Sequence, residues 1–423
     1  MSTHALPGGW RSRLLVAATI TTIAAIAAVP AATAKRSAAS ISFLDLPYDQ
    51  NTIPLYTSAA KAFQAKTGTS VSISQATWDV AHSKFLSLLA AHKQPDVAVF
   101  GPKWLPEFVR LGVLQPLDGY FPKSFLNNFP ASLLKQLTIG GHLWALPEAL
   151  STRLMYYRTD LFEQAGIKSP PKTWKEFTAD AIKLNKPGDH YGFCVQGQGD
   201  ETIWYYTYFL YGAGGRYTNS AGNWAVNQPA NVKALQFEAD LTNRYKVTQP
   251  NPTGTGLDTA QELLVKGQCA MYFGPPWILA QMQQENPKIL KNIAVTDYPT
   301  LSGKPAPLFI QDVFVMFKGA KDPQAVADWL TFWNQDKYQV SFNKTESLIP
   351  VTKTSGAAPY FKQNARIQRF VKSIPYSISY PVKDGWDTVN TEVAKAVQAA
   401  FLGTTAQKAL DTAQAAIERK VKE

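Results

Sequence analysis

The sequence is poor in the residues that usually carry redox and metal chemistry. Among its 423 residues there are only two cysteines and five histidines. The spacing of Cys194 and Cys269 fits no metal motif, and the histidines are scattered without a ligand spacing. We therefore expect neither a metal site nor a cofactor.

Motifs of nucleotide-dependent and hydrolytic enzymes are missing as well. The chain has no P-loop, no H-E-x-x-H, no G-x-S-x-G and no G-x-G-x-x-G after an expected strand. A carboxylate pair that cleaves a glycosidic bond has no fixed sequence spacing, and 31 acidic residues leave such a pair open. A secreted glycan-active enzyme is therefore one rival interpretation.

The chain also lacks any run of basic residues. Its formal net charge is +11, but Lys and Arg are spread along the whole chain. Nucleic-acid binding usually requires a basic patch or stripe, whereas scattered cations are typical of the solvated surface of an exported protein. We expect no nucleic-acid partner.

Only one apolar run is long enough to suggest a targeting segment. Arg11 and Arg13 precede "LLVAATITTIAAIAAV", which ends in "PAATA". This pattern predicts a secretory signal over residues 1–34, cleaved near Ala34, and the run is short for a membrane span. An uncleaved anchor is the alternative. Because no cysteine lies near the cleavage site, we expect a periplasmic protein that is not a lipoprotein.

What the chain does contain is a regular alternation of strand and helix patterns. They follow one another at residues 40–46, 57–68, 70–74, 80–92 and 95–100. Gly68 marks the end of the first expected helix. Strand, helix, strand and helix in this order indicate a mostly parallel α/β sheet.

The alternation restarts after residue 150. Further strands are expected at 154–157, 191–195, 269–273 and 293–299, with helices between them. Thr173 and Glu176 have the spacing of a capping box at a helix start. A long apolar segment, 307–317, is interrupted at Gln311–Asp312. A chain of this length is too long for one core, so we expect two α/β domains.

The two cysteines each lie in one of the expected strands of this second half. In an oxidising compartment Cys194 and Cys269 could pair. Two buried free thiols fit the sequence equally well, because cysteine is often buried unpaired.

Several longer motifs occur together in one order. They are "GGHLWALPEALSTRLMYYRTDLFEQAGIKSPPKTWKEF" at 140–177, "VKGQCAMYFGPPW" at 265–277, "YP" at 298–299 and "SLIPV" at 347–351. In these motifs the mature chain resembles the family 1 extracellular solute-binding proteins of ABC importers, which include maltose-binding and glycerol-phosphate-binding types. One departure is Tyr157–Arg158, where the family has Tyr-Asn.

The resemblance implies an α/β, two-lobed periplasmic-binding-protein fold of type II, the Venus-flytrap form, with three hinge crossings. The N-terminal lobe would take 35–147 and 313–349, and the C-terminal lobe 150–311 and 352–423. The ligand would lie in the cleft between the lobes, and binding would favour the closed form. The loaded protein, expected to be a monomer, would dock on the permease subunits of the transporter.

The resemblance also implies where the ligand is held. Glu148 lies at the first crossing, where its carboxylate could accept two sugar hydroxyls or only orient the hinge backbone. Trp277 matches a family position that stacks on the ligand. The other aromatic candidates are Trp204, Tyr205, Tyr380 and Trp386, and Arg153 and Asp312 are polar candidates near the crossings. Asp49, Asp79 and Trp104 are candidates because they follow the first three expected strands, and ligand loops usually lie at the carboxyl ends of strands. The aromatic ones could pack instead, and each aspartate could instead cap a helix or a turn.

Aromatic and acidic candidates together favour a carbohydrate of one to several rings as the ligand. Glycerol 3-phosphate or its diesters are the alternative, and such a site would need Arg, Lys or helix N-termini in the cleft. A polyamine ligand and a surface interaction protein without a small ligand are further interpretations.

Overall fold

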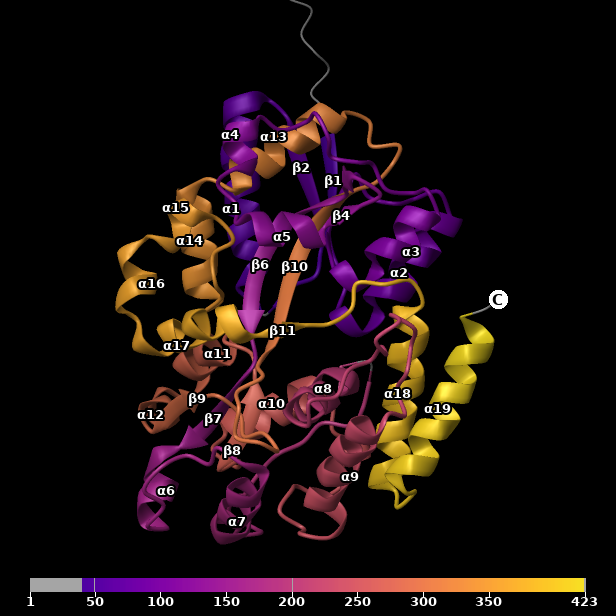
Figure 1. Cartoon of the computed structure of the whole chain (residues 1–423). Coiled ribbons are helices and arrows are strands. Elements are labelled where there is room, and N and C mark those ends of the chain that lie inside the picture. The colour runs from indigo at the N-terminus through magenta and orange to yellow at the C-terminus, as the bar shows by residue number, and fades with distance from the viewer. Residues whose placement is uncertain (1–39, 49, 200, 422–423) are drawn as a thin grey trace, which may run out of the picture. The chain divides into compact units, whose positions relative to one another are not determined.

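The computed structural model describes residues 40–421, apart from Asp49 and Asp200. The expected signal segment, 1–34, lies outside the described residues. No helix within the described range is long and apolar enough to cross a membrane. The described residues fold as one unit, and its elements are arranged around two main sheets (Figure 1).

The first sheet is mixed rather than wholly parallel. Its order is β11-β10-β3-β1-β2, and β6 also pairs with β10. The central β1 is parallel to β2 and β3, as the sequence predicts, whereas β10 is antiparallel to both β3 and β6. The strands are β1 (Ser40–Asp45), β2 (Ser70–Gln75), β3 (Val97–Phe100), β6 (Ala145–Thr152), β10 (Leu308–Met316) and β11 (Ile378–Ser379).

Large aromatic side chains pack the helices against the first sheet and against one another: Tyr56 of α1 lies 4.9 Å from Phe43 of β1 as a ring-centroid distance. The helix α1 begins at Thr52, earlier than its pattern, and ends as predicted before Gly68, which has a φ of 79°. Tyr56 of α1 stacks on Trp333 at a centroid distance of 4.0 Å. The helices around this sheet are α1 (Thr52–Thr67), α2 (Trp78–Ala90), α3 (Leu105–Arg110), α4 (Lys123–Leu126), α5 (Ala131–Gln136), α13 (Pro323–Trp333), α14 (Asp336–Thr345) and α15 (Lys353–Gly356).

The second sheet is antiparallel, which corrects the expectation of parallel strands there. Its order is β8-β7-β9, and both pairings are antiparallel. Alternating strand and helix patterns indicate that a connection exists, but they do not set the direction in which the next strand returns. The strands are β7 (Leu154–Arg158), β8 (Met271–Gly274) and β9 (Ile293–Thr296); a separate hairpin joins β4 (Thr138–Ile139) and β5 (His142–Leu143).

A layer of helices covers the second sheet (Figure 1). The predicted capping box of Thr173 and Glu176 is present at the start of α7. Within the layer α18 packs on α8, α9 and α19. The helices of this part are α6 (Thr159–Gln164), α7 (Trp174–Leu184), α8 (Thr202–Gly212), α9 (Pro229–Asn243), α10 (Leu257–Val265), α11 (Ile278–Glu285), α12 (Pro287–Lys291), α16 (Pro359–Gln363), α17 (Ala365–Ser373), α18 (Trp386–Phe401) and α19 (Ala406–Lys420), with short 3-10 turns at Pro102–Trp104, Pro252–Gly254 and Ile374–Tyr376.

The pairing of β6 with β10 contains one irregularity. Asp312 pairs with Ala149 and the next residue, Val313, pairs with Pro147, so Glu148 is an extra residue on β6. This is a β-bulge, which redirects side chains and locally bends the strand. The apolar segment expected to break at Gln311–Asp312 is therefore one continuous strand whose partner carries the irregularity.

The predicted lobe boundaries fall inside these two strands. Residues 147–150 lie within β6, and residues 311–313 lie within β10. Both strands are buried along their whole length. The exact division of the chain into lobes stays a prediction.

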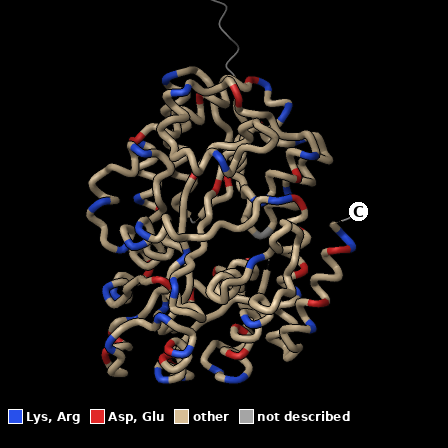
Figure 2. Tube along the Cα trace, in the orientation of Figure 1, with Lys and Arg blue, Asp and Glu red and all other residues tan. Residues whose placement is uncertain are grey.

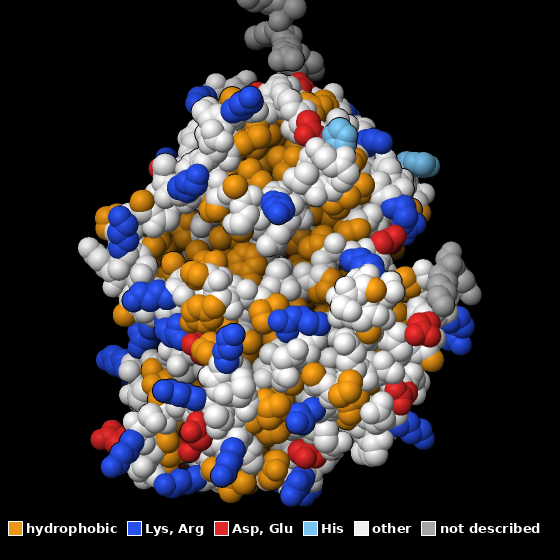
Figure 3. Space-filling view, in the orientation of Figure 1, with side chains coloured by type: hydrophobic (Ala, Val, Ile, Leu, Met, Phe, Trp, Pro, Cys, Tyr) orange, Lys and Arg blue, Asp and Glu red, His pale blue; other side chains and the backbone are white. Residues whose placement is uncertain are grey.

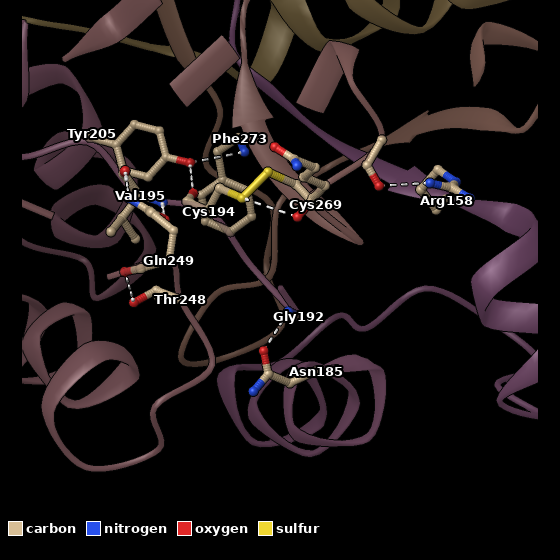
Figure 4. The surroundings of a disulfide bond; sticks show 12 residues. Arg158, Asn185, Gly192, Cys194, Val195, Tyr205, Thr248, Gln249, Cys269 and Phe273 are labelled. Atoms are coloured by element: carbon tan, nitrogen blue, oxygen red, sulfur yellow. Dashed lines mark hydrogen bonds between the residues drawn. A yellow bond between two sulfur atoms is a disulfide. The ribbon is translucent and has the colours of Figure 1, made fainter. Parts of the chain in front are cut away.

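Segment 191–195 was expected to be a strand, and that prediction is wrong. Only one isolated bridge, between Tyr191 and Cys269, involves it. The N–H groups of Tyr191, Phe193 and Cys194 donate to backbone carbonyls of Gln268, Val247 and Met271. Side chains add further bonds: Gln249 accepts from the Val195 N–H, and the Tyr205 hydroxyl donates to the Cys194 carbonyl (Figure 4). The apolar pattern correctly indicates that the segment is buried, but a buried segment need not pair as a β-strand.

The cysteines, whose state the sequence left open, form a disulfide. Cys194 and Cys269 are bonded (Figure 4), and both residues are fully buried. The bond ties the irregular segment 191–195 to the residue that precedes β8 by two positions. It therefore fixes a loop that lacks a strand ladder of its own.

Charged side chains are distributed over the outside of the molecule. Figure 2 shows Lys, Arg, Asp and Glu scattered along the trace. On the face drawn in Figure 3, Lys and Arg are dispersed and form no large continuous patch. This face therefore offers no basic surface for nucleic acid.

Removing the disulfide should lower the stability of the protein. The bond closes a loop with a sequence separation of 75. Proteins typically lose about 3–5 kcal/mol of stability when a disulfide that closes a loop of this size is removed. Urea unfolding should give a lower midpoint for the wild type in reductant and for Cys194→Ala/Cys269→Ala without it. The midpoint of the double variant should not respond to reductant. Equal midpoints for wild type and double variant under oxidising conditions would contradict the prediction.

Candidate functional site

A cavity of about 190 Å³ lies where loops of the first sheet meet helices of the second part. The first sheet contributes residues that follow β1, β2 and β3, together with two residues of β10. The helical part contributes residues of α8, α10 and the start of α11. The lining residues are Pro47, Tyr48, Thr77, Trp78, Gly101, Lys103, Arg153, Glu201, Trp204, Leu257, Asp258, Gln261, Trp277, Ile310, Asp312 and Tyr380.

The position of the cavity follows from the direction of the parallel strands. The strands β1, β2 and β3 all end at the same edge of the sheet, and their carboxyl ends are where α/β proteins hold ligands. Tyr48, Trp78 and Lys103 each lie within three residues of one of these strand ends. Ile310 and Asp312 alternate with Gln311 along β10, so they share the face that points to the cavity.

An acidic centre lies at the bottom of the cavity. The Tyr48 hydroxyl is 2.7 Å from Glu148 Oε2 and 2.7 Å from Asp312 Oδ2. Tyr56 donates to Glu148 Oε1 at 2.7 Å. Asp312 is 8% exposed and lines the cavity, whereas Glu148 is 0% exposed and lies one side chain behind it. Tyr48 therefore connects a carboxyl on the wall to a carboxyl in the core.

Burial raises the pKa values of these acids. Burial raises the pKa of Asp312 to about 6, and the Tyr48 hydrogen bond and the charge of Arg153 oppose this shift. The pKa of Glu148 is raised well above its ordinary value by burial and by the neighbouring charge of Asp312. Burial also raises the pKa of Asp45, at the end of β1, to about 7.

Two cations lie in the wall, and both are already engaged. The guanidinium of Arg153 lies 4.7 Å from the Trp277 ring and donates to Ser151 at 2.6 Å. The Lys103 ammonium lies 4.9 Å from the Trp204 ring and 4.0 Å from Glu201. Three acids of the lining, Glu201, Asp258 and Asp312, outnumber these two cations.

Aromatic rings form much of the remaining wall. Tyr48 lies 5.6 Å from Trp277 and 6.1 Å from Trp78, and Trp204 lies 4.9 Å from Tyr380, all as ring-centroid distances. Flat apolar faces next to a few charged groups are the usual lining of a small-molecule site. They are suited to a ligand that has both an apolar face and polar edges.

Five of the sequence-predicted residues line the cavity: Trp277, Trp204, Tyr380, Asp312 and Arg153. The structure places four others behind the wall. Trp104 is buried against Trp78 and Phe100, Tyr205 is bound to the Cys194 carbonyl, Trp386 stacks on Trp204, and Glu148 contacts Tyr48 and Tyr56. Asp49 lies outside the described residues. Asp79 lies in the first turn of α2, and its side chain is also outside them.

The sequence interpretation missed several lining residues, notably Tyr48, Trp78 and Lys103. Each follows a parallel strand at the edge that holds ligands. The sequence interpretation used these strand ends but selected the adjacent residues Asp49, Asp79 and Trp104, because a strand end does not show which neighbouring side chain points into the cavity. Glu201, Asp258 and Gln261 lie on helices whose orientation the sequence does not reveal. Within the described residues, no group of His, Cys, Asp and Glu is arranged to hold a metal ion.

The family model for "Bacterial extracellular solute-binding protein" matches residues 49–340. A binding protein of Brucella abortus is 31% identical over 359 residues, which covers 84% of this chain and 87% of that protein. The diacetylchitobiose-binding protein of Streptomyces coelicolor is 26% identical over 299 residues, a match that covers 69% of this chain and 68% of that protein.

A solved structure has the same fold. The solute-binding protein of an ABC transporter from Thermotoga lettingae, bound with α-D-tagatose, superposes with a TM-score of 0.83 at 23% identity. The match covers 90% of this chain and 100% of that chain. The similarity confirms the two-lobed solute-binding fold for this chain.

The buried Asp45 should make stability depend on pH. Its pKa is higher in the folded protein than the ordinary value of 3.8, so the carboxyl stays protonated to a higher pH in the folded state than in the unfolded state. The free energy of unfolding should therefore decrease as pH rises from about 4 to about 7. Asp45→Asn should remove part of this decrease and gain about 2–4 kcal/mol over wild type at pH 8.

Urea unfolding between pH 4 and pH 8 measures this effect. Asp328→Asn, which changes an exposed carboxylate on α13, is the matched control and should follow the wild-type curve. Curves for Asp45→Asn and wild type that stay parallel across the range would show that Asp45 does not titrate in this way.

Proposed function

The chain belongs to the family of bacterial extracellular solute-binding proteins, and on this premise we propose that its cavity binds a carbohydrate of one or two rings. The captured sugar is handed to the permease of an ABC importer. The comparisons support a sugar but not its size: one structural neighbour binds tagatose and one relative is named for diacetylchitobiose, whereas other neighbours bind maltotriose or mannotriose. The size rests on the cavity.

The cavity itself is the observation that carries the proposal. It combines five aromatic residues with Arg153 and Asp312 in about 190 Å³, below the range of about 300–1,000 Å³ usual for drug-sized ligands. The apolar face of a sugar ring stacks on Trp277 or Trp204, and its hydroxyls exchange hydrogen bonds with the charged groups at the edges. A long oligosaccharide would extend outside this space.

Glycerol phosphates are not favoured as ligands. A phosphate carries up to two negative charges and needs free cations. Lys103 and Arg153 are present, but each is held by an aromatic ring and a second partner. The acids of the lining would repel an anion further.

We also propose that the protein is exported by its signal segment, is not a lipoprotein, acts in the periplasm as a monomer and does not turn its ligand over. The family is extracellular by description, which supports export. Relatives are named as binding proteins rather than enzymes. Asp312 and Glu148 are joined through Tyr48, so Glu148 cannot reach a ligand as a second catalytic carboxylate.

Sugar binding should stabilise the protein and should depend on the aromatic wall. Mono- and disaccharides, longer oligosaccharides and glycerol phosphodiesters would be tested by thermal shift on protein stripped of carried-over ligand. A ligand at 100 times its dissociation constant adds about 2.7 kcal/mol of stability. Trp277→Ala and Trp204→Ala should each weaken binding about tenfold or more.

The control is Trp144→Phe, an aromatic change outside the cavity at a side chain that bonds to the Ile139 carbonyl. It should leave affinity unchanged. Stabilisation by phosphodiesters alone, or by no solute in the panel, would refute the proposal.

The protein should also release its bound sugar chemically unchanged. After long incubation with excess protein, chromatography should recover the added sugar intact. Appearance of hydrolysis or transfer products in proportion to protein concentration, and their loss in Asp312→Asn, would identify an enzyme instead.

A further inference from the structure

Tyr48 occupies an unusual position because one hydroxyl faces two carboxyl groups. Its oxygen lies 2.7 Å from Glu148 Oε2 and 2.7 Å from Asp312 Oδ2. The other oxygen of Glu148 accepts the Tyr56 hydroxyl at 2.7 Å. These four residues form a hydrogen-bonded row. It runs from Tyr56 in the core through Glu148 and Tyr48 to Asp312 at the cavity.

The number of hydrogens along this row limits its protonation states. A tyrosine hydroxyl has one hydrogen and can donate it to only one of its two carboxyl neighbours. If both carboxyls were ionised, the second close contact would join two oxygens without a hydrogen between them, in a buried region. One carboxyl must therefore carry a proton and donate it to Tyr48.

The surroundings decide which carboxyl carries the proton. Glu148 is fully buried, and the other ionisable groups nearest to it are the acids Asp45 and Asp312. Behind Tyr56 lies a further acid, Glu346, which accepts from Thr52. No cation contacts Glu148 among the described residues. A buried carboxyl among acids is neutral by preference.

Asp312 has the opposite surroundings. It is partly open to the cavity, and the charges of Arg153 and Lys103 both favour its ionised form. Glu201 and Tyr380 also face this region, and Glu201 opposes ionisation. The pKa values agree with this assignment, since that of Glu148 is raised well above its ordinary value and that of Asp312 only to about 6.

We propose that Glu148 is held as a neutral acid and that all hydrogen bonds in the row run one way, from Tyr56 to Glu148, from Glu148 to Tyr48 and from Tyr48 to Asp312. Asp312 then meets the cavity only as an acceptor. If the cavity binds a sugar, as proposed above, the ligand must present a hydroxyl or N–H to Asp312. Glu148 acts as a positioning residue and does not touch the ligand.

The one-way row links ligand binding to protons. A ligand that donates to Asp312 stabilises its carboxylate, so binding below about pH 7 releases the proton that Asp312 holds there. Affinity should be constant at higher pH. It should fall as pH decreases through about 6, by up to about tenfold per pH unit.

Infrared spectroscopy of the ligand-free protein tests the row without any sugar. A protonated carboxyl has a C=O band that a carboxylate lacks. At pH 8, the wild type minus Glu148→Gln difference should show loss of one acid band, and Asp312→Asn should show loss of a carboxylate. Glu163→Gln, an exposed change on α6, should lose a carboxylate. Loss of a carboxylate in Glu148→Gln, or of an acid band in Asp312→Asn, would overturn the proposal.

Binding measurements test the same assignment from the ligand side. Gln at position 148 can replace a neutral acid, because its carbonyl accepts from Tyr56 and its amide donates to Tyr48. Glu148→Gln should therefore keep affinity within about threefold of wild type, since no hydrogen bond is lost. Asp312→Asn should lose about tenfold or more, the effect of losing a bond to a charged acceptor.

The two experiments distinguish a failure of the proposed row from a failure of the proposed function. An acid band at Glu148 in a protein that binds no sugar would support the row and refute the proposed function. A sugar-binding protein in which Glu148→Gln loses as much affinity as Asp312→Asn, and whose Glu148 is ionised, would refute the row and leave the function standing.

Discussion

The structure depends on one extra residue in the pairing of β6 with β10. Without Glu148 the two strands would pair in register from Ala145 to Thr152. With it, the register of the ladder shifts between Asp312 and Val313, and an acidic side chain is placed in the core. Burying a carboxyl is costly unless it is neutral and hydrogen-bonded. Tyr48 and Tyr56 supply those bonds, so the bulge, the segment after β1 and α1 meet at this carboxyl.

The aromatic and polar groups of the cavity come from both parts of the fold. Tyr48 and Trp78 follow strands of the first sheet, whereas Trp204 and Trp277 belong to the helical part. A ligand can contact all of them only when the two parts are together. Its binding energy therefore favours that arrangement over any other, which is how a solute can shift a hinged protein toward one form.

Much of the fold could be predicted from local signals, because they act within a few residues. Gly68 ends α1 because its left-handed backbone suits glycine, and Thr173 with Glu176 starts α7 because the two side chains satisfy free N–H groups. The antiparallel second sheet and the irregular segment 191–195 were missed because they depend on distant partners. The backbone carbonyls of Val247 and Met271 and the side chains of Tyr205 and Gln249 bind that segment, and no periodicity in the sequence indicates that they do.

Only part of the candidate site could be predicted from the sequence, because the rest depends on distant partners as well. Trp277 and Asp312 could be found from motif and pattern, but whether a residue faces the cavity or lies behind it depends on packing between elements. Glu148 illustrates the distinction: an acid between apolar runs indicates a special position, yet its distance from the ligand is set by Tyr48, 100 positions away in sequence. The sequence thus identifies an unusual carboxyl, while only the structure shows that Tyr48 lies between it and the carboxyl on the cavity wall. In the proposed row, Glu148 influences recognition by orienting the Tyr48 hydroxyl toward Asp312 rather than by touching the ligand.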